Sequence, residues 1–239
     1  METASNTTKC KNRKLGLTLA VLVLLPLFLL RLAAGQIASA QPAGNQSQTR
    51  YIITDLGTLV QGKIAFEFAG QVTNFPPTPA APLGSSNQYG YLTSVRGIDN
   101  VFSGSPHNET TALLTFFNEA NTTETTMDGP LRIVDRNGTT TIYLNSAPAS
   151  FANPDSFRSG IPVQTSTLHQ QAIADTVAGT FTAVFANTIS STTAFTINGT
   201  TFTLGQKGQA FRATVTGHLN ATPPPTGYFG GYAVGVGEE

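Results

Sequence analysis

Residues 153–176 of the chain, NPDSFRSGIPVQTSTLHQQAIADT, contain the residue types of a hydrolytic site. Ser156, His169 and Asp175 are a serine, a histidine and an acid, the combination in which histidine activates a serine nucleophile and the acid orients the histidine. In many such enzymes the serine lies on a strained G-x-S-x-G turn. That pattern occurs nowhere in the chain, so a nucleophilic serine is not the favoured interpretation.

The first part of this stretch, residues 153–160, has the composition of a loop. Asn153 and Pro154 favour a turn, because proline fixes φ and the asparagine side chain bonds to the nearby backbone. Arg158 follows Asp155 closely enough to form an ion pair with it. The sequence therefore predicts a turn-rich loop that is held by an Asp155–Arg158 pair.

The second part, residues 163–176, is predicted to be a long β-strand. Because side chains alternate between the two faces of a strand, His169, Gln171 and Asp175 share one face. Neither face is cleanly apolar, which leaves two alternatives. The favoured one is that the His169 face is exposed to solvent. In the other it lines a polar lumen, where His169 and Gln171 lie about 7 Å apart and the histidine acts as an acid or base.

Other chemistry is poorly supported by the sequence. The three histidines, His107, His169 and His218, are far apart, and their spacing predicts no metal site. Neither a G-x-G-x-x-G motif nor a P-loop occurs, so no nucleotide cofactor is predicted. The weak catalytic candidates are His169, Gln171 and Asp175, and no ligand-binding residue is identified.

The segments around this stretch are predicted to be β-strands. Short runs rich in Thr, Val, Ile and Phe alternate between apolar and polar residues, and turn residues separate them. We expect an all-β fold with about nine or ten strands, either a single antiparallel β-barrel or, alternatively, a β-sandwich. Hairpin turns are predicted at residues 136–138 and at Asn198-Gly199. Residues 74–88 contain four prolines and are predicted to be an exposed loop, and the tail at residues 222–239 is predicted to start with a stiff proline run and then to include a closing strand.

The first 40 residues resemble a signal for export. Basic residues precede an apolar run of 16 residues, Leu15 to Leu30, and small residues lead up to Ala40. This arrangement predicts a signal peptide at residues 1–40 that is cleaved after Ala40, and the alternative is an uncleaved N-terminal membrane anchor. Residues 41–50 are predicted to be a flexible lead, and residues 51–239 a single domain. The protein is thus expected to be secreted or at the cell surface, with no membrane association after cleavage.

Removal of residues 1–40 would leave a slightly acidic domain without cysteine. This segment holds the only cysteine, Cys10, and five of the 13 basic residues, and only one of the 13 acidic residues. The remainder carries 8 basic and 12 acidic residues. Nucleic-acid and anionic-membrane binding depend on clustered Lys and Arg, so neither partner is expected. Thiol chemistry is excluded from the mature domain.

These observations favour an exported, non-enzymatic β domain that binds a small apolar or amphipathic ligand or has a role at the cell surface. Two alternatives stay open: a barrel enzyme, isomerase- or cyclase-like, with a lumen site around His169, and a structural or adhesive surface protein. A closed antiparallel barrel resembles the lipocalins and the allene oxide cyclases in architecture alone, and this resemblance assigns no residue a role.

Overall fold

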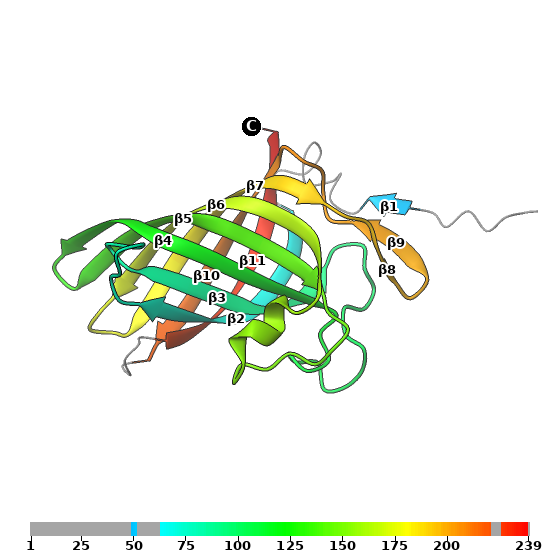
Figure 1. The fold of residues 1–239 in the computed structure, drawn as a ribbon, viewed down its shortest axis with the longest axis horizontal. Helices are drawn as coiled ribbons and strands as arrows, with labels where there is room; N and C mark the ends of the chain where they lie inside the picture. Colours follow the sequence, from blue (N-terminus) through cyan, green and yellow to red (C-terminus); the bar gives the residue numbers. More distant parts are fainter. Residues whose placement is uncertain (1–48, 52–62, 221–225, 239) are drawn as a thin grey trace, which may run out of the picture. The chain divides into compact units, whose positions relative to one another are not determined.

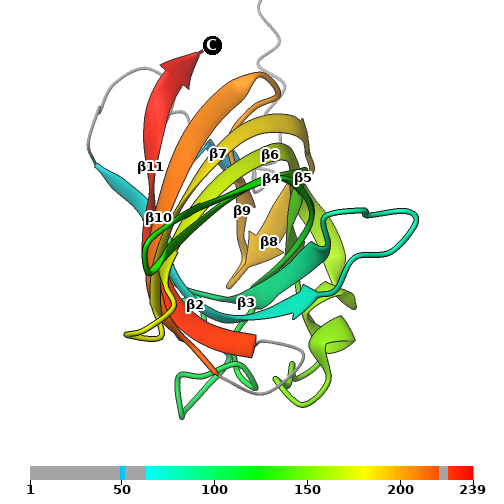
Figure 2. The same ribbon diagram turned by 90° about the vertical axis from the view of Figure 1, so that its left-hand side faces the viewer.

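The main structural element is a closed barrel of eight antiparallel strands, in the order β10-β11-β2-β3-β4-β5-β6-β7 (Figures 1 and 2). The computed structural model describes residues 49–51, 63–220 and 226–238. The predicted all-β barrel is confirmed. The elements are β1 (Thr49–Tyr51), β2 (Ile64–Phe75), β3 (Ser85–Val95), β4 (Leu114–Asp128), β5 (Leu131–Leu144), the 3₁₀ helix η1 (Pro154–Arg158), β6 (Ile161–Asp175), β7 (Thr180–Thr192), β8 (Phe195–Ile197), β9 (Thr200–Thr203), β10 (Gln209–Leu219) and β11 (Thr226–Glu238).

The C-terminal strand closes the barrel. On one side β11 pairs with β10, where Tyr232 lies opposite Thr214, and on the other it pairs with β2, where Tyr232 lies opposite Glu67. The prediction of a closing strand in the tail is confirmed. Since full closure leaves no unpaired strand edge in a barrel, the first and last strands of the barrel stabilise each other.

Alternating residues place a phenylalanine-rich core inside the barrel. On β7, Phe181 and Phe185 are buried whereas Val184 between them is exposed. Neighbouring rings meet edge to face: the Phe66 and Phe211 centroids are 5.5 Å apart, an arrangement that adds to the stability from burial. The inward positions on β7 and β10 agree with the alternation expected from the sequence.

One predicted hairpin is wrong. Residues 136–138 do not form a turn, because β5 runs without interruption from Leu131 to Leu144. The Asn-Gly pair was misleading: Gly138 lies where β5 approaches β4 so closely that a Cβ would collide with the Glu119 backbone carbonyl. The real turn is at Gly129-Pro130, where Gly129 has a φ of 58°, and proline suits the second position because its φ is fixed.

The other predicted hairpin is confirmed, but it lies outside the barrel. Asn198 and Gly199 have φ angles of 51° and 78°, as a type I′ turn requires. Strands β8 and β9 flank this turn and form a small sheet with β1, which pairs in parallel with β9. The sheet includes Thr49 and Arg50 from the predicted flexible lead.

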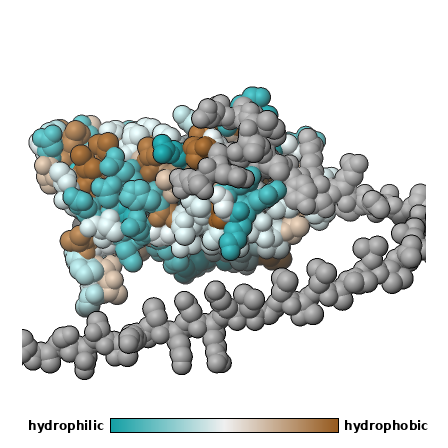
Figure 3. Space-filling model, turned by 90° about the horizontal axis from the view of Figure 1, so that it is seen from above, coloured by the Kyte–Doolittle hydropathy of each residue, from teal (hydrophilic) through white to brown (hydrophobic). Residues whose placement is uncertain are grey.

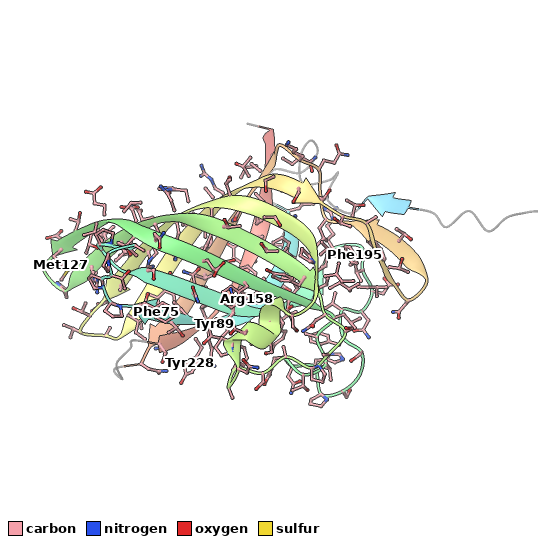
Figure 4. All side chains as sticks on the ribbon, in the orientation of Figure 1. Phe75, Tyr89, Met127, Arg158, Phe195 and Tyr228 are labelled. Atoms are coloured by element: carbon pink, nitrogen blue, oxygen red, sulfur yellow. The ribbon has the colours of Figure 1, made fainter. Side chains whose placement is uncertain are left out.

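The β8–β9 hairpin lies at the end of the barrel opposite to the β4–β5 hairpin, as the positions of Phe195 and Met127 show (Figure 4). Phe195 and Phe202 are both buried and belong to the same hydrophobic cluster as the barrel interior. The buried Gln164 Nε2 donates to the Leu204 carbonyl at 2.8 Å. These contacts fasten the hairpin segment to the barrel at this end.

The proline-rich segment connects β2 to β3. The strands extend to Phe75 and from Ser85, so the irregular part spans only residues 76–84. Thr78 and Ala81 exchange backbone hydrogen bonds within it, of 3.0 and 3.1 Å. The predicted signal peptide lies outside the described residues. Within the part of the chain that the structure describes, no helix is long and apolar enough to cross a membrane.

Candidate ligand-binding site

The His169 face of β6 lies on the outside of the barrel. His169 and Gln171 are exposed, and they bond to outward-facing residues of β5: His169 Nδ1 is 2.8 Å from Asn137 Oδ1, and Gln171 Nε2 donates to Asp135 at 3.2 Å. Opposite residues on adjacent strands are close enough for such pairs. These contacts are cross-strand pairs on a solvated surface.

Asp175 has a different place and a different partner. Its carboxylate accepts hydrogen bonds from the backbone N–H groups of Val177 and Ala178, at 2.9 and 2.8 Å, in the β6–β7 turn. The alternative in which His169, Gln171 and Asp175 line a lumen is therefore wrong. Because both faces of β6 are polar, the alternation alone could not show which face is inside.

The Ser156 segment is a loop packed against the outside of the barrel. Ser156 Oγ donates to the Asn153 carbonyl at 2.6 Å and accepts from the Ser150 N–H at 2.8 Å, so its described partners are backbone groups of its own loop. The predicted pair of Arg158 with Asp155 is present at 2.7 Å. The structure does not bring Ser156 together with His169 in any described contact.

Arg158 also fixes this loop to β4. Its guanidinium lies 4.5 Å from the centre of the Phe117 ring and 2.9 Å from a Glu119 carboxylate oxygen. Phe157 of the same loop is fully buried in a second aromatic cluster with Tyr89 and Phe117; Figure 4 labels Arg158 and Tyr89. This cluster covers the outer face of β3 and β4.

The opposite face of β6 points into the barrel and supplies part of a buried polar layer. Gln170 is 3% exposed, and its Oε1 accepts a hydrogen bond of 3.0 Å from Gln88 Nε2 on β3. Gln88 Oε1 accepts in turn from Asn118 Nδ2 on β4, at 3.2 Å. Buried amides are stable when they are paired in this way, and here they form a chain of hydrogen bonds across the lumen.

A cavity of about 930 Å³ lies on one side of this layer. Residues at its outer end belong to the β2–β3 connection, the β6–β7 turn and the end of β10, which share the end of the barrel that faces the viewer in Figure 2. The walls are mainly apolar, and Gln88, Gln170 and Arg136 are the polar groups furthest along their strands from this end. The apolar wall consists of Val72, Val134, Ala172, Ala174, Phe181, Phe185, Leu219 and Phe229.

Arg136 is the most unusual side chain of the cavity. It is only 8% exposed, and its Nη2 donates to Asn74 Oδ1 of β2 at 2.9 Å, while its Nε has no hydrogen-bond partner. Burial lowers the pKa of Arg136 to about 10, and the positive charge of Arg132 contributes in the same direction. Arg136 lies opposite Gln170 in the β5–β6 register, so the guanidinium belongs to the polar layer.

A second, smaller cavity lies among the buried rings. Its volume is about 30 Å³, enough for about one water molecule. Asn118 Oδ1, Thr140 Oγ1 and Asn187 Oδ1 belong to residues that line it and have no hydrogen-bond partner within the protein. Buried oxygens of this kind commonly bind internal water.

The outer surface has a different character from the lumen. On the face seen in Figure 3, hydrophilic and neutral residues dominate the described surface, and hydrophobic residues form small groups between them. Among the described residues, no group of three or more His, Cys, Asp and Glu side chains could hold a metal ion.

Comparison of the chain with family models, with curated proteins and with solved structures found no match. The class of protein is thus defined by fold and cavity alone: a closed eight-stranded antiparallel barrel with a chamber inside one end. Sequence reasoning missed the chamber residues. The available signal was the spacing of Arg132, Val134 and Arg136, which places two arginines on the same face of β5 as Val134 and Ile142, both of which are buried.

Proposed function

We propose that this protein binds one small amphipathic molecule inside the barrel. The observation that carries the proposal is the cavity of about 930 Å³, which is within the range of about 300–1,000 Å³ typical of small-molecule sites. Its apolar walls suit an apolar body, and its few converging polar groups suit one polar head. An exported or cell-surface location is part of the same proposal and is supported by the apolar run at Leu15 to Leu30.

The first test is a fluorescence titration with the uncharged probe N-phenyl-1-naphthylamine. The folded protein is expected to bind the probe with 1:1 stoichiometry. The variant Ala172→Trp adds a large side chain to the cavity wall and is expected to weaken probe binding at least tenfold.

A matched control lies on the same strand. Thr167 is exposed on the outer face of β6, so Thr167→Trp adds the same side chain outside the barrel and is expected to bind the probe as the unchanged protein does. Circular dichroism establishes that both variants are folded. Equal probe binding by folded Ala172→Trp, or no binding by the unchanged protein, would contradict the proposal.

A further inference from the structure

Arg136 indicates the chemistry of the ligand's head. A buried charge is unfavourable unless it is paired, and Arg136 is 8% exposed with one amide oxygen as its described partner. None of the described residues that line the cavity is acidic. The protein itself thus supplies no negative charge in this chamber to balance the guanidinium.

The guanidinium also has hydrogen-bond donors left for an anion. Arg136 lines the cavity, and of the five N–H groups of a guanidinium only Nη2 has a described partner, Asn74 Oδ1. The planar guanidinium fork matches the two oxygens of a carboxylate better than it matches a single oxygen. Arg132 lines the same cavity and adds a second positive charge to the field that an entering anion meets.

We propose that the ligand is a single-chain carboxylate, bound with its carboxylate at Arg136 and its apolar chain directed toward the mouth of the barrel. This inference rests on the proposed function and names its ligand class. Gln170, opposite Arg136 on β6, and Asn74, bonded to the guanidinium, lie beside the head. A carboxylate carries one negative charge and so matches the one buried guanidinium, whereas the second charge of a phosphate dianion would be unpaired at this depth, because Arg132 is exposed and lies nearer the mouth.

The orientation follows from the order of residues along the strands. On β5, Arg136 is four residues, roughly 13 Å, further from the β4–β5 turn than Arg132. On β6, Gln170 is followed toward the turn by Ala172, Ala174 and Thr176, which all line the cavity. The apolar wall therefore lies between the guanidinium and the mouth, where it contacts the chain of a ligand that enters head first.

The test compares ligands that share a ten-carbon chain and differ in the head. Decanoate, 1-decanol and decyl phosphate are titrated at pH 7.5 in competition with N-phenyl-1-naphthylamine. A charge-assisted hydrogen bond to the buried arginine is expected to make decanoate bind about 10- to 100-fold tighter than decanol. Decanoate should also bind more tightly than decyl phosphate, and tighter binding of decyl phosphate would overturn the assignment of the ligand head to a carboxylate.

Variants separate the head from the chamber. Arg136→Met replaces the guanidinium with an apolar side chain of similar length, and we expect it to bind decanoate and decanol within threefold of each other. Arg212→Met is the matched control, because Arg212 is exposed on the outer face of β10, and it should keep the full preference for decanoate.

The outcomes distinguish this inference from the proposed function. If the neutral probe and decanol bind but decanoate binds no tighter than decanol to the unchanged protein, the carboxylate inference is overturned and the chamber function stands. If neither the neutral probe nor decanol binds, the proposed function fails as well. The comparison in the unchanged protein needs no variant, so it decides the question even if Arg136→Met does not fold.

Discussion

Removal of the Arg136 charge should stabilise the ligand-free protein. Burial lowers the pKa of Arg136 from the ordinary value of arginine to about 10 in the folded state. Because one pKa unit corresponds to about 1.4 kcal/mol, the charged guanidinium costs the folded state about 3 kcal/mol at neutral pH. Arg136→Met removes this cost and also loses the hydrogen bond to Asn74, worth about 1 kcal/mol.

At neutral pH the substitution should therefore raise the free energy of unfolding by about 2 kcal/mol. For a domain of this size, about 1 kcal/mol raises Tm by about 2–4 °C, so the variant should melt roughly 4–8 °C above the unchanged protein. The assay is differential scanning calorimetry on protein freed of ligand by unfolding, extraction and refolding. Arg212→Met, on the outer surface, should change the free energy of unfolding by less than about 0.5 kcal/mol.

The pH dependence gives a second readout of the same prediction. Since the folded-state pKa of Arg136 is lowered, the folded protein loses the guanidinium proton at a lower pH than the unfolded chain does. The cost is therefore fully present below pH 10 and disappears as pH rises from about 10 toward the ordinary pKa of arginine. The Tm difference between Arg136→Met and the unchanged protein should shrink above pH 10. A variant that melts below the unchanged protein at pH 7.5 would refute the reasoning.

Three further predictions concern the barrel and its outer loop. Gly138→Ala forces a Cβ against the Glu119 backbone and should lower the free energy of unfolding, measured by urea denaturation, by at least about 2 kcal/mol. The control Gly104→Ala places its Cβ where no atom lies within 4 Å and should leave the stability nearly unchanged. Equal effects of the two substitutions would contradict the argument that β4 and β5 approach closely at Gly138. Arg158→Ala removes partly exposed ion pairs and one cation–π contact and should lower the free energy of unfolding by only about 1–2 kcal/mol. Limited proteolysis at residues 145–160 should become faster, and an unchanged rate of cleavage would show that the loop is held without Arg158. His169→Ala should leave probe and decanoate binding unchanged, because its ring bonds to Asn137 outside the barrel, and a loss of binding in the titrations above would contradict the placement of this face.

Most of the fold could be predicted because the chain alternates strictly where it has one buried face. On β7 and β10 the phenylalanines and alanines mark the lumen. The hairpin at residues 136–138 could not be judged correctly from local composition. Asn-Gly is typical of a turn, but there the glycine is needed where two neighbouring backbones come close, which depends on the whole barrel.

The candidate site could be predicted only in part. The sequence showed that β6 has two polar faces, and the face with the histidine attracted the chemical interpretation. The inward face is polar because Gln170 pairs with Gln88 of β3, 82 residues away in the chain, and such a partner has no local signature. The same holds for Arg136 and Asn74, which meet across the lumen from β5 and β2.

The packing of the β8–β9 hairpin at the far end of the barrel has a kinetic consequence. With Phe195 and Phe202 buried in the core there and the chamber lined at the other end, a molecule bound as proposed would enter and leave by the same route. Exchange must then be sequential, because an occupant has to leave before its successor enters. A competitor in solution would not accelerate release, and the residence time would depend only on how strongly the occupant is held.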